Sequence, residues 1–330
     1  MSAVPMVELW RGGLLESTHS GHAVICNAAG EVIESWGDPG VVIFPRSSCK
    51  MIQALPLVES GAADAVGLTT RHLAFACASH LGAGIHRAMA ADWLGGLGMG
   101  DADLRCGVQE PDDRTERNRL IAEGEAPCQL HNNCSGKHSG FLTLNRHLRG
   151  GTEYVEHDHP VQQAAKAAYE ETTAETSAGW GIDGCSAPNF ASTLTGFARA
   201  LGAFAGATEG GDTRQKAMVR LRQAMTLHPE LVSGEGGACT ELMRAMGGRV
   251  TLKGGAEGVY AAILPDQGLG IALKIVDGSE RAKEAAIAAL LVRAGVLDAE
   301  HPATRRRLNA VQLNRRGIET GVVTTAVSFP

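Results

Sequence analysis

A serine and a lysine three residues apart form the first pair in the chain that could perform chemistry. They are Ser47 and Lys50, which follow the segment Phe44-Pro45-Arg46. If Ser47 lies at a helix N-terminus, Lys50 falls one turn later on the same face, within reach of the hydroxyl. A lysine whose pKa is lowered by burial can accept the serine proton. The pattern predicts a serine nucleophile, with a capping serine beside an exposed lysine as the alternative.

A second serine and a second lysine occur further along the chain. Ser79 follows the apolar run 73–78, and Lys253 is expected just before the first strand of the C-terminal part. Glycines 254 and 255 would let substrate or backbone approach that lysine closely. Taken alone, Ser79 is also explained as a turn or capping residue. The order of the three motifs resembles that of penicillin-recognising serine hydrolases.

Two polar segments in the middle of the chain contain cysteines that could bind a metal. Residues 131–140 include Cys134, and residues 181–189 include Cys185. The two thiols could meet in space and share a soft ion such as zinc. Their spacing matches neither a zinc finger nor a metalloprotease helix, so two reduced cysteines in packed loops stay the alternative.

The composition excludes several classes of protein. Of 330 residues, 44% are hydrophobic, which is enough for a sizeable core, and 30 basic against 36 acidic residues give a net charge of −6. An acidic chain gives no support for a nucleic-acid partner. The longest apolar run, 285–292, is far shorter than the roughly 20 residues that span a bilayer. With no apolar leader at the N-terminus, we expect a cytoplasmic protein that has no membrane partner and whose eight cysteines are reduced.

Both ends of the chain have the patterns of strands, and the middle has helical spacing. The expected strands are 4–10, 22–26, 31–36, 258–264, 270–276 and 320–327. A helix over 280–294 is expected to begin at Ser279 and to point Arg281, Lys283 and Glu284 at solvent. Helical patterns in the middle include 161–171 and 214–227.

These patterns predict an α/β protein of the α+β type. An antiparallel sheet from both chain ends is flanked by helices, with a helical insert between them. We expect one compact unit over 1–330, in which 1–45 and 250–330 form the sheet-containing part and 46–249 the mainly helical part.

Together these segments resemble the rhizobial-type (class 3) L-asparaginases. The likeness spans nearly the whole chain in order, and its most specific block is Asn133-Cys134-Ser135-Gly136-Lys137-His138. The other matching segments are 7–12, 45–50, 78–80, 183–185 and 255–258. The resemblance implies a fold similar to serine β-lactamases, a homodimer, and hydrolysis of L-asparagine to L-aspartate and ammonia.

The resemblance also implies roles for particular residues. The two catalytic couples would be Ser47 with Lys50 and Ser79 with Lys253. One zinc ion per chain would be bound by Cys134, Lys137 and Cys185. The substrate pocket would be lined or supported by Arg46, His138, Asp183 and Cys239.

The mechanism expected from the serine–lysine pair is acyl transfer. Neutral Lys50 takes the proton of Ser47, which attacks the amide carbon, and Ser79 is the rival nucleophile. Two other functions stay open at this point. One is a penicillin-binding or β-lactamase-like serine hydrolase, and the other is a non-catalytic zinc-binding protein.

Overall fold

The computed structural model describes residues 2–330, and contacts within the chain divide it into two units. The sheet unit comprises the residues up to Ser48, together with Ser192–Gly206 and Glu241–Pro330. The helical unit comprises Cys49–Ala191 and Ala207–Thr240. Each unit therefore contains segments that are distant in sequence.

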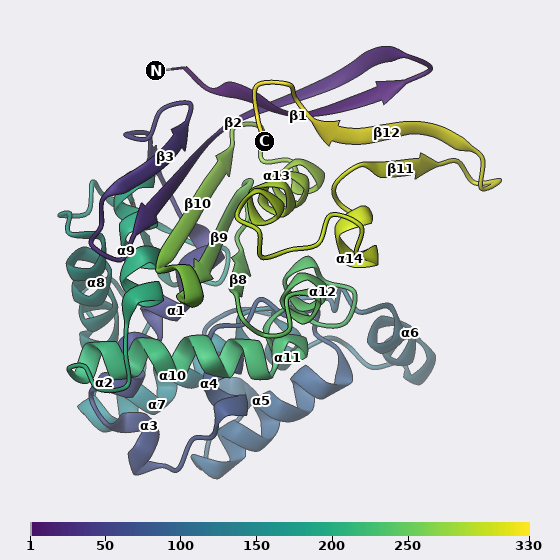
Figure 1. Ribbon diagram of the computed structural model, residues 1–330. Coiled ribbons are helices and arrows are strands. Elements are labelled where there is room, and N and C mark those ends of the chain that lie inside the picture. Colours follow the sequence, from purple (N-terminus) through teal and green to yellow (C-terminus); the bar gives the residue numbers. More distant parts are fainter. Residues whose placement is uncertain (1) are drawn as a thin grey trace. The chain divides into compact units, whose positions relative to one another are not determined.

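The sheet unit is built on an antiparallel sheet of eight strands (Figure 1). Seven of them lie in the order β11-β12-β1-β2-β10-β9-β8, and β3 pairs with β2. Their bounds are β1 Val4–Arg11, β2 Leu14–Asn27, β3 Val32–Trp36, β8 Thr251–Gly254, β9 Val259–Leu264, β10 Leu269–Ile275, β11 Ala310–Leu313 and β12 Glu319–Thr325. Three strands come from the N-terminal end and five from the C-terminal end, which confirms the predicted α+β sheet from both chain ends.

Three details of the sheet differ from the sequence prediction. β2 begins at Leu14 because its first half, although mostly exposed and polar, pairs with β1. β11 was not anticipated, since its side chains are largely exposed and give no continuous apolar signal. Lys253 lies inside β8, paired with Ala261 of β9, and not before the first C-terminal strand.

Two helices pack on this sheet. α9 (Leu194–Gly206) contacts β10 and β2. The backbones of α9 and β10 approach closely at two glycines: a Cβ added to Gly270 would lie only 2.2 Å from the Gly202 nitrogen. α9 thus belongs with the sheet, although the sequence analysis assigned 46–249 to the helical part. α13 (Glu280–Arg293) contacts β1, β9, β10 and β12, and begins at the predicted cap, Ser279.

Lys283 of α13 does not face solvent, contrary to the sequence prediction. Its side chain is buried, and its Nζ donates a 2.6 Å hydrogen bond to the Gly255 carbonyl and lies 2.7 Å from a carboxylate oxygen of Glu280. The buried ammonium is stable there because both acceptors replace water. The residue therefore anchors the loop that follows Lys253.

The helical unit is a bundle of helices (Figure 1), and it also contains one small two-stranded hairpin. Its helices are α1 Lys50–Gln53, α2 Leu55–Glu59, α3 Ala62–Ala65, α4 Thr70–Ala76, α5 Gly84–Gly96, α6 Arg114–Glu123, α7 Ser135–Leu148, α8 Pro160–Thr173, α10 Thr213–Leu227 and α11 Pro229–Ser233. The hairpin consists of β5 Trp180–Ile182 and β6 Pro188–Phe190. The predicted helices over 161–171 and 214–227 are confirmed as α8 and α10.

The remaining elements are short. The 3₁₀ turns are η1 Arg46–Cys49, η2 Asp101–Asp103, η3 Gln129–His131 and η4 Pro265–Gln267. In the sheet unit, β4 Val42–Ile43 pairs with β7 Ser192–Thr193, and α14 spans Pro302–Arg305. α12 (Ala238–Ala245) begins at the end of the helical unit.

α7 packs against α4 through glycine. A Cβ on Gly136 would lie 2.1 Å from the Phe75 carbonyl oxygen, so the first turn of α7 lies directly against the backbone of α4. Gly140, one turn later, faces Ala76 and Leu57. Only glycine permits this approach, and it places the start of α7 next to the segment that leaves α4.

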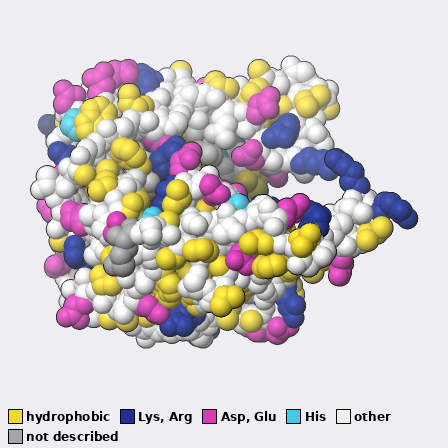
Figure 2. All heavy atoms as spheres, turned by 90° about the horizontal axis from the view of Figure 1, so that it is seen from above, with side chains coloured by type: hydrophobic (Ala, Val, Ile, Leu, Met, Phe, Trp, Pro, Cys, Tyr) yellow, Lys and Arg dark blue, Asp and Glu magenta, His cyan; other side chains and the backbone are white. Residues whose placement is uncertain are grey.

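The face of the molecule shown in Figure 2 carries Lys and Arg side chains interspersed with Asp and Glu. Among residues 2–330, no helix is both long enough and apolar enough to span a membrane.

Replacing Gly136 by alanine should destabilise the protein. The new methyl group would meet the Phe75 carbonyl, so backbone must shift at a cost of about 1–3 kcal/mol in the free energy of unfolding. Gly95→Ala, inside α5 with no atom within 4 Å of the added Cβ, is the matched control and should be neutral or stabilising by up to about 1 kcal/mol. Chemical denaturation of both variants measures the difference. Equal stabilities would contradict the close packing of α7 on α4.

Candidate functional site

The amine of Lys50 lies at the centre of a buried cluster in the helical unit. Lys50 begins α1 and is only 1% exposed. Its Nζ is 3.0 Å from the Ser79 hydroxyl, 3.1 Å from the Cys134 sulfur, and hydrogen-bonded to the Ala78 carbonyl. A charged ammonium would donate to all three acceptors. A neutral amine could donate to two of them and accept the serine proton with its lone pair.

Backbone hydrogen bonds fix the segment that carries Ser79. The chain leaves α4 after Ala76, and the Ser79 N–H donates to the Val232 carbonyl at 2.9 Å. The N–H of the next residue, His80, donates to the Asn133 carbonyl at 3.2 Å. Ser79 is therefore held beside the segment that leads into Cys134 and α7.

Cys134 and Cys185 lie next to each other beside Lys137. The hydrogen bond from Cys134 holds the pKa of Cys185 well below its usual range, and the charge of Lys137 lowers it further against the effect of burial. The same hydrogen bond, followed by burial, raises the pKa of Cys134. Lys137 Nζ donates to the Cys185 sulfur at 2.9 Å. Burial acts to lower the pKa of Lys137, but the two sulfurs outweigh it, and the pKa is raised.

The β5–β6 hairpin positions Cys185. Asp183 and Ala187 close its turn with a 2.9 Å backbone hydrogen bond, and the Gly184 N–H donates to the Asp183 carboxylate at 2.8 Å. Ser186 adopts the left-handed conformation with φ of 70°. This tight turn buries the Cys185 side chain while Asp183 stays partly exposed.

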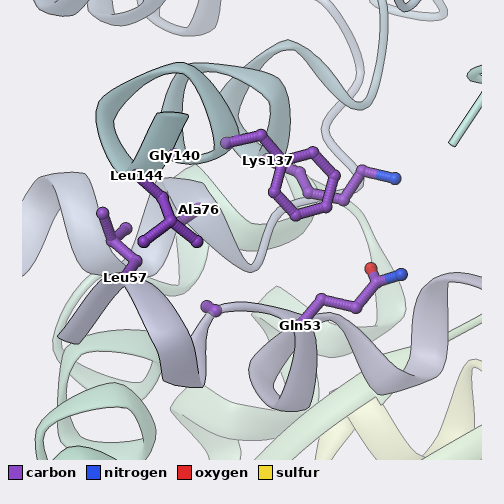
Figure 3. A pocket seen from close by; sticks show the side chains of 8 residues that line it. Gln53, Leu57, Ala76, Lys137, Gly140 and Leu144 are labelled. Atoms are coloured by element: carbon purple, nitrogen blue, oxygen red, sulfur yellow. The ribbon is translucent and has the colours of Figure 1, made fainter. Parts of the chain in front are cut away.

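The aliphatic part of the Lys137 side chain lies mainly among apolar side chains. It lines a cavity of about 10 Å³ together with side chains of α1, α2, α4 and α7, including Gln53, Leu57 and Leu144 (Figure 3). Its Nζ lies 5.3 Å from the centre of the Phe141 ring. The aliphatic part of the Lys137 side chain thus packs mainly among apolar groups, while its amine reaches the Cys185 sulfur.

The donor set of this cluster fits a soft divalent metal. Among the described residues, no three His, Cys, Asp or Glu side chains are placed to hold an ion. Here the third member is an amine: Cys134, Cys185 and Lys137 already converge through hydrogen bonds. Two sulfurs and a nitrogen are donors that zinc accepts once they are deprotonated.

Three predicted site residues belong to the sheet unit: Ser47, Lys253 and Arg46. Ser47 is half-buried in η1, and its hydroxyl has no hydrogen-bond partner among the described residues of that unit. The Ser48 hydroxyl, in contrast, donates to the Pro45 carbonyl at 2.6 Å. Lys253 is buried in β8 and donates to the Gly254 carbonyl at 2.7 Å. A Cβ on Gly255 would lie 2.9 Å from the Ser48 nitrogen, so the loop after Lys253 packs on η1.

Arg46 lines an open hollow of about 450 Å³ in the sheet unit. It shares the hollow with exposed apolar side chains such as Phe44 and Val276, and with Lys274 and Glu257. Arg46 and Glu257 are both left-handed, with φ of 53° and 56°, and their charged groups lie 3.9 Å apart. The hollow is thus lined by both apolar and charged side chains.

The other predicted pocket residues lie in the helical unit. His138 is fully buried in α7, one turn after Cys134, and Cys239 is buried at the start of α12. One network of contacts joins five side chains of the helical unit: Lys50, Ser79, Cys134, Lys137 and Cys185. Asp183 and His138 lie close enough to this network to interact electrostatically with it.

The sequence analysis missed two neighbours of this network. Cys49 is buried, and burial, countered in part by Lys137, raises the pKa of its thiol to about 12. Its position next to Lys50 in the sequence was the available signal. Tyr154 contacts His138 from the loop between α7 and α8, and no local pattern pointed to it.

The protein therefore has a mixed α/β fold and a network of contacts among Ser79, two lysines and two cysteines. A sequence model of the L-asparaginase II family matches residues 7–325, nearly the whole chain. The chain belongs to the L-asparaginase II family, as the resemblance predicted. Comparison with curated proteins finds no match.

Solved structures similar to this one include a β-lactamase from Mycobacterium bovis and a protein named Mglu in its native form. The first is 13% identical, with a TM-score of 0.48, and the match covers 84% of this chain and 95% of that one. The second is 11% identical, with a TM-score of 0.46, and the match covers 89% and 69%. Both scores are below 0.5, so the family assignment depends on the sequence match alone. The likeness to serine β-lactamases stays a prediction.

Proposed function

We propose that this protein hydrolyses the side-chain amide of L-asparagine to L-aspartate and ammonia through a serine–lysine acyl-enzyme. Membership of the L-asparaginase II family supports an amidohydrolase that acts on a small molecule. The observation that carries the serine–lysine chemistry is the 3.0 Å contact between the Nζ of buried Lys50 and the Ser79 Oγ. A buried amine within hydrogen-bond distance of a hydroxyl is the geometry that general-base activation needs.

In the proposed reaction Lys50 is the base. As a neutral amine it donates hydrogen bonds to the Ala78 carbonyl and the Cys134 sulfur and accepts the proton of a serine hydroxyl. The serine oxygen forms a bond to the carboxamide carbon, the carbon–nitrogen bond breaks, and the proton leaves with ammonia. Water then hydrolyses the ester, which releases aspartate and restores the serine.

Two serines compete for the acyl group in this proposal. The sequence favours Ser47, whose hydroxyl makes no hydrogen bond to the described residues of the sheet unit. The contact with Lys50 favours Ser79. The couples Ser47–Lys50 and Ser79–Lys253, and the roles of Arg46, Asp183 and Cys239 in binding substrate, are proposals that follow from the resemblance.

We also propose that Cys134, Lys137 and Cys185 hold one zinc ion per chain. When bound, zinc would supply a positive charge that orients polar groups of the substrate. The chain's own contribution is to gather the three donors, with the Lys137 amine 2.9 Å from the Cys185 sulfur. The homodimer implied by the resemblance is a further proposal, which light scattering in solution tests.

One assay separates this proposal from its two rivals. Ammonia release from L-asparagine, with and without a chelator, supports the amidohydrolase. Stable acylation by a β-lactam without ammonia release would support a penicillin-binding or β-lactamase-like enzyme. Zinc binding with neither reaction would support the non-catalytic protein.

Replacing Lys50 by methionine should lower kcat/KM for L-asparagine by about a hundredfold or more, because the base is removed. Lys166→Met on α8, whose ammonium is 3.9 Å from Glu170 at the surface, is the matched control and should keep normal turnover. Circular dichroism checks that both variants fold. A folded Lys50→Met variant with near-normal turnover would refute the assignment of the base.

Mass spectrometry of a slow substrate trapped on the enzyme should show an acyl adduct on one serine. An adduct on the Ser47 peptide would assign the nucleophile that the sequence predicts. An adduct on the Ser79 peptide would assign the serine that contacts Lys50. Rapid turnover with neither peptide labelled under trapping conditions would contradict the acyl-enzyme.

Replacing Cys185 by alanine should abolish zinc binding, because it removes the sulfur that Lys137 and Cys134 contact. Elemental analysis after dialysis should find about one zinc per wild-type chain and almost none in the variant. Cys26→Ala, a buried cysteine in β2 of the sheet unit, is the control and should keep the metal. Equal zinc content in Cys185→Ala and wild type would rule out this ligand set.

A further inference from the structure

The open hollow of about 450 Å³ in the sheet unit has the size of a small-molecule site. Three large apolar side chains that line it are well exposed: Phe44 at 46%, and Val42 and Val276 at 56% each. Single exposed apolar side chains are ordinary on a protein surface, but a group of them around one concavity is typical of a binding site. The hollow therefore suits a ligand that has an apolar part.

Two neighbouring strands supply one side of this hollow. Lys274 of β10 is directly opposite His22 of β2 in the antiparallel register, so the two side chains lie next to each other on one face of the sheet. Val276 falls on the same face two residues later. Gly270, also on this face, packs against the backbone of α9. The hollow thus begins where α9 no longer covers the sheet.

β4 and the residues that follow it supply the other side of the hollow. β4 pairs with β7, which immediately precedes α9, so the pairing ties this segment to the start of the helix. Ile43 is buried, whereas its neighbours Val42 and Phe44 are exposed and line the hollow. The exposed apolar side chains therefore stand on an anchored strand and not on a loose loop.

The side chains that line the hollow carry one more positive than negative charge. Arg46 and Lys274 are cations, and Glu257 is the one carboxylate among them. Burial holds the pKa of His22 below its usual value, and its Nδ1 accepts a 2.8 Å hydrogen bond from a backbone N–H, so this ring is neutral. Arg46 already lies 3.9 Å from Glu257. The charge that is left without a counterion is that of Lys274.

The ammonium of Lys274 has hydrogen-bond donors to spare. Among residues 2–330 its Nζ donates one hydrogen bond, to the Glu257 carbonyl, although an ammonium has three N–H groups. The nearby Asp277 carboxylate is instead 2.6 Å from His19 Nδ1. Because the lysine is half-buried, its charge is incompletely hydrated, and burial lowers its pKa. An anion in the hollow would accept the remaining hydrogen bonds and balance this charge.

The backbone around the charged groups is also unusual. Arg46 and Glu257 are both left-handed, with φ of 53° and 56°, although neither is glycine. Such conformations are costly, and they gather at ligand-binding positions, where the surrounding structure holds them. The conformation brings the two charged side chains together at the hollow and leaves Lys274 accessible beside them.

We propose that this hollow binds a small monocarboxylate with an apolar body, the chemistry of a medium-chain fatty acid. The carboxylate accepts hydrogen bonds from Lys274 Nζ, and the hydrocarbon part lies against Val42, Phe44 and Val276. L-Asparagine and L-aspartate have no such apolar part, so this ligand differs in class from the substrate and product of the proposed reaction. The inference stands whether or not the chain hydrolyses L-asparagine.

Calorimetric titration of the full-length protein tests the ligand class. Butanoate, hexanoate and octanoate should each bind at one site, with affinity rising up to about fourfold for each added methylene. The uncharged 1-hexanol should bind about tenfold more weakly than hexanoate, because it cannot balance the lysine charge. Absence of saturable octanoate binding, or equal affinities for hexanoate and 1-hexanol, would overturn the inference.

The position of the carboxylate is tested at Lys274. Lys274→Met keeps most of the side-chain volume and should weaken hexanoate binding about tenfold while leaving 1-hexanol binding unchanged. Lys274→Arg restores the charge and should recover most of the affinity. Lys166→Met on α8 is the matched control and should bind hexanoate as the wild type does. Unchanged hexanoate affinity in folded Lys274→Met would refute the proposed contact.

The apolar contact is tested at Phe44. Phe44→Ser should weaken octanoate and 1-hexanol binding alike, whereas Ile121→Ser, at an exposed position of α6, should weaken neither. Octanoate binding that survives Phe44→Ser would place the ligand elsewhere. A change of oligomeric state in Phe44→Ser without loss of octanoate affinity would identify the hollow as a protein interface instead.

Competition separates this site from the proposed reaction. Saturating L-aspartate should leave the octanoate affinity unchanged. Displacement of octanoate by L-aspartate would assign the hollow to the substrate pocket in which Arg46 is proposed to lie, and the inference would fail. Loss of asparaginase activity in the wild-type protein would overturn the proposed function alone, since the titrations do not depend on turnover.

Discussion

Lys50 is almost entirely removed from solvent, and an amine in that environment is stable only when its N–H groups meet acceptors. Those acceptors come from two other segments, the end of α4 and the start of α7. Three parts of the helical unit are thereby held to one another by a single nitrogen. The proposed chemistry depends on this arrangement, since proton transfer requires the hydroxyl and the amine to be already in contact.

Backbone packing makes that contact possible. Because Gly136 lets α7 lie against the Phe75 carbonyl, Cys134 comes within reach of the residues that follow α4. Such a contact is invisible in the sequence, where Gly136 looks like one more small residue in a polar segment. The matching strands at the two chain ends were predictable, since their apolar runs have the period of a sheet.

The candidate site was predictable in its members and less so in its pairings. The order of the motifs pointed to Ser79, and the polar segments around Cys134 and Cys185 pointed to the cysteines, because no hydrophobic period explains those segments. That Lys50 contacts Ser79 could not be predicted, since the two lie 29 residues apart and meet only through tertiary packing. Lys283 was misplaced for a related reason: a charged residue on a helix is usually exposed, and its carbonyl partner is 28 residues away.

Cys134 contacts both the proposed base, Lys50, and a proposed metal ligand, Cys185. Its sulfur is 3.1 Å from Lys50 Nζ, and its thiol hydrogen-bonds Cys185. The base and the metal ligands of the proposed enzyme are therefore coupled through one atom. A reagent or an oxidant that modified this sulfur would disturb both at once, and no mutation there could be interpreted as affecting only one of them.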